Sequence, residues 1–261
     1  QAFEKLIREF PQSSLARKAG IQLGLLYYND NQPEKALAAY KQVISNYPGS
    51  EEAKIALQDL KSVYIDLNDI NAYASYVNSI GGNIRLEVGE QDSLTYIAAE
   101  KLFMRGDNDG ARRSLAGYLQ TFPEGAFSSN ANFYLGSIAF AKKEFDEAIQ
   151  RFKSVIASGD TKFLEESVAR TAEIEYLSKD YPAALESFKR LQIVAENPEN
   201  RQAARLGIMR CALQTGQQKD ALLAANELLK EPKLSPELEA EARYVRAKAY
   251  IAQKQANKAL A

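Results

Sequence analysis

The residues of this chain best suited to acid–base chemistry are four carboxylates within one short stretch: Glu165, Glu166, Glu173 and Glu175. Such catalysis needs a positioned carboxyl group beside the reacting atoms, usually with a partner of different pKa. Adjacent carboxylates on an exposed helix are usually solvated, and no nucleophile or set of metal ligands accompanies these four. We therefore expect the chain not to be an enzyme.

Nucleophile and metal chemistry is limited by composition. The sequence has no histidine and one cysteine, Cys211, so most metal sites and Cys-His or Ser-His-Asp arrangements cannot be assembled from it. Cys211 lies in the apolar run LGIMRCAL, which favours a small core residue over a reactive thiol. The run GDNDG at 106–110 lacks the length and closing glutamate of a calcium loop, so it predicts a turn. We expect no metal and no cofactor.

The composition favours an all-α protein that binds other proteins. Hydrophobic residues make up 46% of the 261 residues, and no strand-rich segment is apparent. Thirty-three basic and thirty-four acidic residues nearly cancel, so no overall field attracts nucleic acid. The sequence contains no run of about 18 apolar residues, so we expect no direct membrane insertion of this chain. The expected partner is a protein or peptide, and the oligomeric state is left open.

The elements that position these residues repeat along the chain. The segment AFEKLIREFP at 2–11 matches AYKQVISNYP at 39–48, 37 residues later, in alanine, aromatic, aliphatic and proline positions. A small anchor residue recurs at spacings of 36 to 39, as Ala36, Ala72, Ala111, Ala148, Ala184, Ala221 and Ala259. Such a period is the signature of a helical repeat array.

Each repeat is predicted to be a pair of helices. A bulky residue follows the anchor one helical turn later in five repeats, as Tyr40, Tyr76, Leu115, Phe152 and Phe188. The preceding helix carries a Leu-Gly pair at 23–24 and 135–136, where glycine allows close helix contact. Short polar turns, such as KKEFDEA at 142–148, make the two helices antiparallel neighbours. About fourteen helices are expected.

This pattern resembles the tetratricopeptide repeat family, whose Leu-Gly, Tyr, Ala, aromatic and Pro positions are matched by Leu23, Gly24, Tyr27, Ala36, Tyr40 and Pro48. The likeness covers almost the whole chain, although the early Trp of the family is absent. It implies an all-α, right-handed superhelical solenoid of antiparallel helical hairpins. Residues 10–48 also resemble bacterial cell-envelope members, such as the TolA-binding periplasmic protein and the outer-membrane assembly lipoprotein. That likeness implies a periplasmic or outer-membrane-associated location in a Gram-negative bacterium, with the cytoplasm still open.

The array is expected to have one internal break and open ends. Residues 79–92, SIGGNIRLEVGEQD, interrupt the period with three glycines, so we predict repeats at 1–80, an irregular linker at 81–92 and further repeats at 93–261. The linker is either a hinge or a packed long loop. Because residues 2–11 match the second half of a repeat and the chain stops within another, we expect it to be a piece of a longer protein.

The resemblance implies a concave groove lined by the first helix of each hairpin. We predict the following groove residues: Lys18, Lys54, Lys61, Tyr96, Glu100, Asn130, Phe133, Ser137, Glu166, Glu173, Arg210, Tyr244 and Lys248. Their charges run basic, acidic and basic along the chain, and the alternative is an ordinary solvated surface. The aromatic residues Tyr96, Phe133 and Tyr244 either anchor a peptide or pack between helices. The series Tyr28, Tyr64, Phe103, Phe140 and Tyr176 is interpreted as core.

Two functions follow from this pattern. The first is a scaffold for protein–protein interaction in a bacterial envelope complex, which binds a peptide or a partner domain along the groove. The alternative is an accessory or regulatory repeat region of a larger enzyme or regulator, whose catalytic part lies outside this sequence. The flanking sequence of the full-length protein would distinguish the two.

Overall fold

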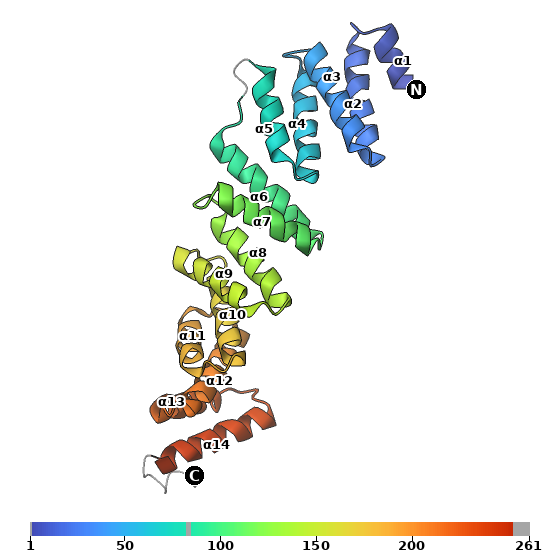
Figure 1. Cartoon of the computed structure of the whole chain (residues 1–261). Helices are drawn as coiled ribbons and strands as arrows, with labels where there is room; N and C mark the ends of the chain where they lie inside the picture. The colour runs from blue at the N-terminus through green and yellow to red at the C-terminus, as the bar shows by residue number, and fades with distance from the viewer. Residues whose placement is uncertain (1, 82–84, 253–261) are drawn as a thin grey trace. The chain divides into compact units, whose positions relative to one another are not determined.

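The computed structural model describes residues 2–81 and 85–252. Those residues form fourteen α-helices and no strand, which confirms the predicted all-α class and the repeated helical hairpin (Figure 1). The chain divides into two compact units, residues 1–128 and 129–261. The predicted irregular linker at 81–92 falls inside the first unit, and as a domain boundary it stays a prediction.

The first unit contains the first seven helices: α1 (Ala2–Glu9), α2 (Ser14–Asn29), α3 (Pro33–Asn46), α4 (Glu51–Asp66), α5 (Ile70–Ile80), α6 (Val88–Met104) and α7 (Asn108–Thr121). The pairs α2–α3, α4–α5 and α6–α7 are hairpins whose helices pack together. The first helices also contact one another, α2 with α4 and α4 with α6. This contact between first helices is what makes them line a common face.

The second unit holds the other helices: α8 (Ser128–Ala141), α9 (Phe145–Ser158), α10 (Leu164–Leu177), α11 (Tyr181–Val194), α12 (Pro198–Gln214), α13 (Gln218–Leu228) and α14 (Pro236–Ala252). Here α10 packs on α11 and α12 on α13, and each helix from α9 to α14 contacts the next. The first helices α10, α12 and α14 again contact in sequence, α10 with α12 and α12 with α14. None of the described helices is both long and apolar enough to span a lipid bilayer.

Local sequence explains where the helices begin and end. The side chains of Ser13, Ser50 and Asp180 cap helix N-termini by accepting a backbone N–H. Asp107 does the same for α7, accepting from the amide of Gly110 at 2.9 Å. The run GDNDG is therefore a turn only at Gly106 and Asp107, and its last three residues begin α7 because Asp107 caps the helix. Each turn inside a hairpin contains one residue of positive φ, in order Asn31, Asn68, Gly106, Lys143, Lys179 and Gly216.

The anchor alanines lie where the two helices of a hairpin meet. Five of them have no exposed surface, namely Ala36, Ala111, Ala148, Ala184 and Ala221, whereas Ala72 is half-buried and Ala259 lies outside the described residues. Each glycine of the Leu-Gly pairs faces the bulky residue of its own hairpin. A Cβ at Gly136 would lie 2.9 Å from the Phe152 ring, and Gly24 meets Tyr40 in the same way. The predicted repeat register is therefore confirmed at these positions.

The predicted linker and Cys211 are the two remaining sequence features that the structure describes. Helix α6 begins at Val88, so residues 88–92 of the predicted linker are helical, while residues 82–84 lie outside the described part. Leu86, within the same stretch, packs against the core of the first unit. Cys211 is fully buried, and burial raises the pKa of its thiol to about 11, as expected of a core residue.

Candidate functional site

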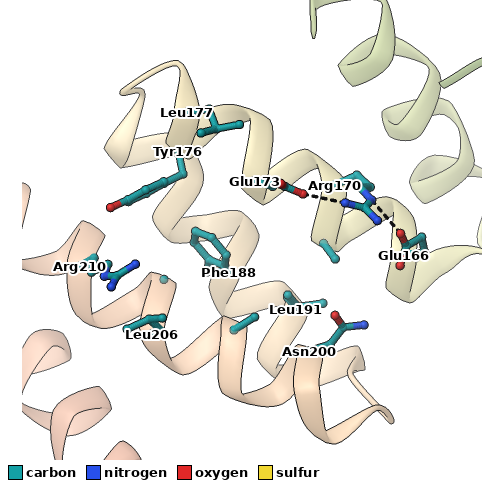
Figure 2. A pocket seen from close by; sticks show the side chains of 13 residues that line it. Glu166, Arg170, Glu173, Tyr176, Leu177, Phe188, Leu191, Asn200, Leu206 and Arg210 are labelled. Atoms are coloured by element: carbon teal, nitrogen blue, oxygen red, sulfur yellow. Dashed lines mark hydrogen bonds and ion pairs between the residues drawn. The ribbon is translucent and has the colours of Figure 1, made fainter. Parts of the chain in front are cut away.

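A cavity of the second unit lies between α10, α11 and α12 (Figure 2). It has a volume of about 390 Å³. We call it the α10–α12 pocket, and its lining residues are Glu166, Ala169, Arg170, Glu173, Tyr176, Leu177, Phe188, Leu191, Asn200, Ala203, Leu206, Gly207 and Arg210. A cavity of this size, with apolar walls and few polar groups, is typical of a binding site.

The floor of the pocket depends on a glycine. Phe188 of α11 lies against the backbone of α12 at Gly207, where a Cβ would clash with the aromatic ring. Figure 2 shows the Phe188 ring between Tyr176 and Leu191, all three on the same side of α12. The Tyr176 and Phe188 rings meet edge to face with centroids 6.4 Å apart. Leu177 of α10 is 55% exposed at the pocket rim, an apolar contact surface open to solvent.

One edge of the pocket carries an ion-pair cluster centred on Arg170. Its Nε lies 2.7 Å from Oε1 of Glu166, and its Nη1 lies 2.9 Å from Oε2 of Glu173 (Figure 2). The guanidinium carbon also lies 4.9 Å from the centroid of the Phe140 ring. Partial burial acts to lower the pKa of Arg170, but Glu166 and Glu173 outweigh it and raise that pKa. The guanidinium group is thus charged and fixed in position.

The opposite edge carries Arg210, which Glu241 of α14 holds in place. Two hydrogen bonds of 2.7 Å join the guanidinium Nε and Nη2 to the two carboxylate oxygens. These bonds raise the pKa of Arg210 and lower the pKa of Glu241. Because the pair spans α12 and α14, it fixes the arginine at the pocket edge and ties one repeat to the next.

Asn200 lies at the end of the pocket where α12 begins. Its Nδ2 donates to Oε1 of Glu165 at 2.7 Å, and the same carboxylate accepts from the backbone amides of Glu196 at 2.9 Å and Asn197 at 3.2 Å. Burial acts to raise the pKa of Glu165, but these three hydrogen bonds outweigh it and lower that pKa. Glu165 thereby holds the loop that precedes α12.

The four carboxylates considered for catalysis therefore have structural partners. Glu165 holds the loop before α12, and Glu166 and Glu173 hold Arg170. Glu175 is buried, accepts from the hydroxyl of Ser187 at 2.6 Å and lies 3.2 Å from Nζ of Lys153. Each carboxylate orients another group of the repeat, and within the described residues no cluster of acidic, histidine or cysteine side chains could hold a metal ion.

The structure brings three of the predicted groove residues together, Glu166, Glu173 and Arg210, all at the α10–α12 pocket. Lys54 and Lys61 line a separate cavity of about 410 Å³ in the first unit, where Lys61 lies 3.4 Å from Glu90. The remaining predicted groove residues do not line either cavity, and they are Lys18, Tyr96, Glu100, Asn130, Phe133, Ser137, Tyr244 and Lys248.

Two of the three aromatic groove candidates stack on a second ring, which supports the packing alternative for them. Tyr96 is 2% exposed and stacks on Phe127 with ring centroids 4.4 Å apart. Phe133 stacks in the same way on Phe163 at 4.2 Å. Tyr244 differs, because it is 62% exposed on α14, with Nζ of Lys248 lying 5.9 Å from its ring centroid.

Several pocket residues were missed by the sequence analysis, chiefly Arg170, Asn200 and Leu177. Tyr176 was interpreted as core, yet it is half-buried and lines the pocket. Arg170 could have been found from its flanking glutamates, since Glu166 and Glu173 lie four residues before and three after it on one helix. Asn200 carries no such local signal, because its partner Glu165 is 35 residues away.

Two parts of the chain match the sequence profiles of a known protein family. Profiles described as tetratricopeptide repeat match residues 19–50 and residues 98–161. No curated protein matches the chain in sequence.

Solved structures with similar folds include MamA, with 18% identity and a TM-score of 0.44 over 68% of this chain and 91% of that one. Another is YrrB, described as a TPR protein with an unusual peptide-binding site, with 17% identity and a TM-score of 0.39 over 78% of this chain and 98% of that one. A third is PilF of Pseudomonas aeruginosa, with 16% identity and a TM-score of 0.43 over 92% of this chain and 98% of that one.

Proposed function

We propose that this chain, which matches tetratricopeptide repeat profiles at residues 19–50 and 98–161, is a scaffold that binds a peptide or a partner domain along the first helices of its repeats. The observation that carries the proposal is the α10–α12 pocket, where two adjacent first helices and the helix between them form an apolar floor with polar edges. Central apolar contacts surrounded by a polar rim are typical of protein interfaces.

The polar groups at the edges favour specificity over affinity. Arg170 and Arg210 are already paired with carboxylates of the same chain, so a partner gains little new ion-pair energy from them. Exposed ion pairs contribute only about 0 to 1 kcal/mol. Binding energy would therefore come mainly from burial of Leu177, which is 55% exposed, and of the exposed part of Leu206, while the paired charges determine the orientation of the partner.

Residues outside the pocket are proposed to make further partner contacts on first helices, within each unit separately. Tyr244 and Lys248 of α14 are exposed next to each other, and Lys18 is exposed on α2. Lys54 and Lys61 of α4 add basic groups in the first unit. In this proposal they make peripheral contacts, whose strength should fall as salt screens them.

The proposal is tested by site-specific photo-crosslinking of the full-length protein in its native cells. A photoreactive phenylalanine analogue at Leu177 should crosslink to a discrete partner, because this side chain is exposed at the pocket edge. Ile193 is the matched control, since it is an aliphatic residue of α11 that is 84% exposed and lies outside the pocket. A partner captured equally at both positions, or at neither, would contradict the proposed surface.

We also propose that the scaffold works in a bacterial cell envelope. The support is the resemblance of residues 10–48 to cell-envelope members of the family. Fractionation of cells that express the tagged full-length protein should recover it from the periplasm or the outer membrane. Recovery from the cytoplasm alone would disprove this location and leave the scaffold proposal standing.

A further inference from the structure

Two aromatic stacks recur at equivalent positions of successive repeats. Tyr96 of α6 stacks on Phe127, and Phe133 of α8 stacks on Phe163, with interplanar angles of 3° and 15°. The first residue of each stack lies fifteen positions before the anchor alanine of its own repeat. The second lies twenty-one positions before the anchor alanine of the next repeat. Each stack therefore joins a first helix to the start of the following one.

The next repeat has lost both rings of this stack. By the same count from the anchors, its first residue is Ala169 and its second residue is Asn200. Both residues line the α10–α12 pocket. The pocket therefore lies where this repeat lacks the two rings that the two preceding repeats stack at the same positions.

The dimensions and walls of the pocket suit an aromatic ring. An apolar cavity of about 150 Å³ is enough to hold benzene, and this one measures about 390 Å³. Its apolar walls are Tyr176, Leu177, Phe188, Leu191 and Leu206. The rings among these walls resemble those of Phe152 and Tyr134, which Phe133 and Phe163 meet beside their own stack.

The charged groups of the pocket also select for an aromatic ring. Arg170 already lies over one ring face, that of Phe140, and planar guanidinium groups favour such contacts. A charged side chain of either sign would lose its water of hydration in the pocket. It would meet groups of both signs that are already paired within the chain, so it would gain little in return. An aliphatic side chain would fill the space without a ring to place against the guanidinium groups.

We propose that the α10–α12 pocket binds one phenylalanine or tyrosine side chain of a partner protein, which takes the place of the aromatic stack missing between Ala169 and Asn200. This inference rests on the proposed scaffold function and specifies what the scaffold recognises. The partner's ring packs against Phe188 and Leu206, with Arg170 and Arg210 at the pocket edges.

The probe for this site is a pair of small compounds that differ only in the side chain. Methyl NMR spectra of the full chain would be recorded with N-acetyl-phenylalaninamide and, separately, with N-acetyl-leucinamide. The phenylalanine compound should shift the methyl signals of Leu177, Leu191 and Leu206 in a saturable way through its ring current. The leucine compound should bind about tenfold more weakly or not at all. Equal binding of the two compounds, or no shift at these methyl groups, would overturn the proposal.

A substitution that restores the ring checks the location. Ala169→Phe should fill the pocket from within and abolish the shifts, while Ala157→Phe, at an exposed position of α9, should leave them unchanged. If circular dichroism shows that Ala169→Phe does not fold, Asn200→Phe fills the same space from the other stack position. Shifts that survive the filled pocket would place the ring elsewhere and contradict the proposal. Crosslinking at Leu177 without aromatic binding would refute this inference alone and leave the scaffold function intact.

Discussion

The contact between Gly207 and Phe188 gives the most direct test of the pocket geometry. A Cβ added at Gly207 would clash with three atoms of the Phe188 ring. Gly117 of α7 is the matched control, because it is also inside a helix but a Cβ there would meet nothing within 4 Å. The two glycine-to-alanine substitutions therefore differ only in whether the new methyl group has room.

The expected magnitudes have opposite signs. Replacing a glycine inside a helix by alanine stabilises the helix by about 1 kcal/mol, and Gly117→Ala should show this gain in full. At Gly207 the same gain is set against the cost of overpacking, about 1 to 3 kcal/mol. Gly207→Ala should therefore lower the free energy of unfolding or leave it nearly unchanged. The free energy of unfolding of the Gly207→Ala variant should be about 1 to 3 kcal/mol lower than that of the Gly117→Ala variant.

Urea unfolding followed by circular dichroism measures both variants. The midpoint should rise for Gly117→Ala and should fall or stay unchanged for Gly207→Ala, with the slope unchanged in each case. Adding Phe188→Leu should make Gly207→Ala less costly than it is beside the phenylalanine, which a double-mutant cycle detects as coupling. If Gly207→Ala stabilises the chain as much as Gly117→Ala, the close approach of α11 to α12 is wrong and the pocket floor with it.

Three further predictions concern titrating groups around the core and the pocket. The lowered pKa of Glu165 means that its hydrogen bonds contribute stability above the ordinary carboxyl pKa, and that this contribution is lost as pH falls through the lowered value. Glu165→Gln should therefore reduce stability at neutral pH and flatten its decline in acid, measured by urea unfolding across pH. The thiol of Cys211, with its pKa raised to about 11 by burial, should resist Ellman's reagent at mildly alkaline pH until urea unfolds the chain. Breaking the partly exposed Arg210–Glu241 pair should cost no more than about 1 kcal/mol in a double-mutant cycle, and less at high salt.

The repeat could be predicted from sequence because its packing is periodic. Each hairpin must bury the same small and bulky residues, so Ala148 and Phe152 are identified by spacing alone, and both are buried. The pocket could not be predicted in the same way. It is defined by rings that are absent at Ala169 and Asn200, and the stack partners Phe127 and Phe163 lie next to helix starts, where no helical period applies.

Tyr96 and Phe133 show why a recurring aromatic residue is ambiguous in sequence. Both occupy one position of the repeat, and that position was compatible with either an exposed anchor or an internal contact. The outcome depends on whether a second ring faces it from the next repeat, as Phe127 and Phe163 do. Tyr244 occupies the same position and is exposed, so position within the repeat does not by itself determine burial.

The loss of the stack at Ala169 and Asn200 is tolerated because another contact holds the same loop. Asp92 and Glu165 occupy equivalent positions, nineteen residues before the anchor alanine of their repeats. Asp92 accepts from the backbone amide of Ala126 at 2.8 Å, and Glu165 accepts from two amides of the loop before α12 and from Asn200. Hydrogen bonds to a charged group contribute about 1.5 to 3 kcal/mol each, less where solvent screens them as at Glu165, and an aromatic pair contributes about 0.5 to 1.5 kcal/mol beyond its burial, so the hydrogen bonds together can match the missing stack. Since Glu165, through the two backbone amides and Asn200, fixes the start of α12 without an aromatic ring, the space left by the missing stack is available to a ligand.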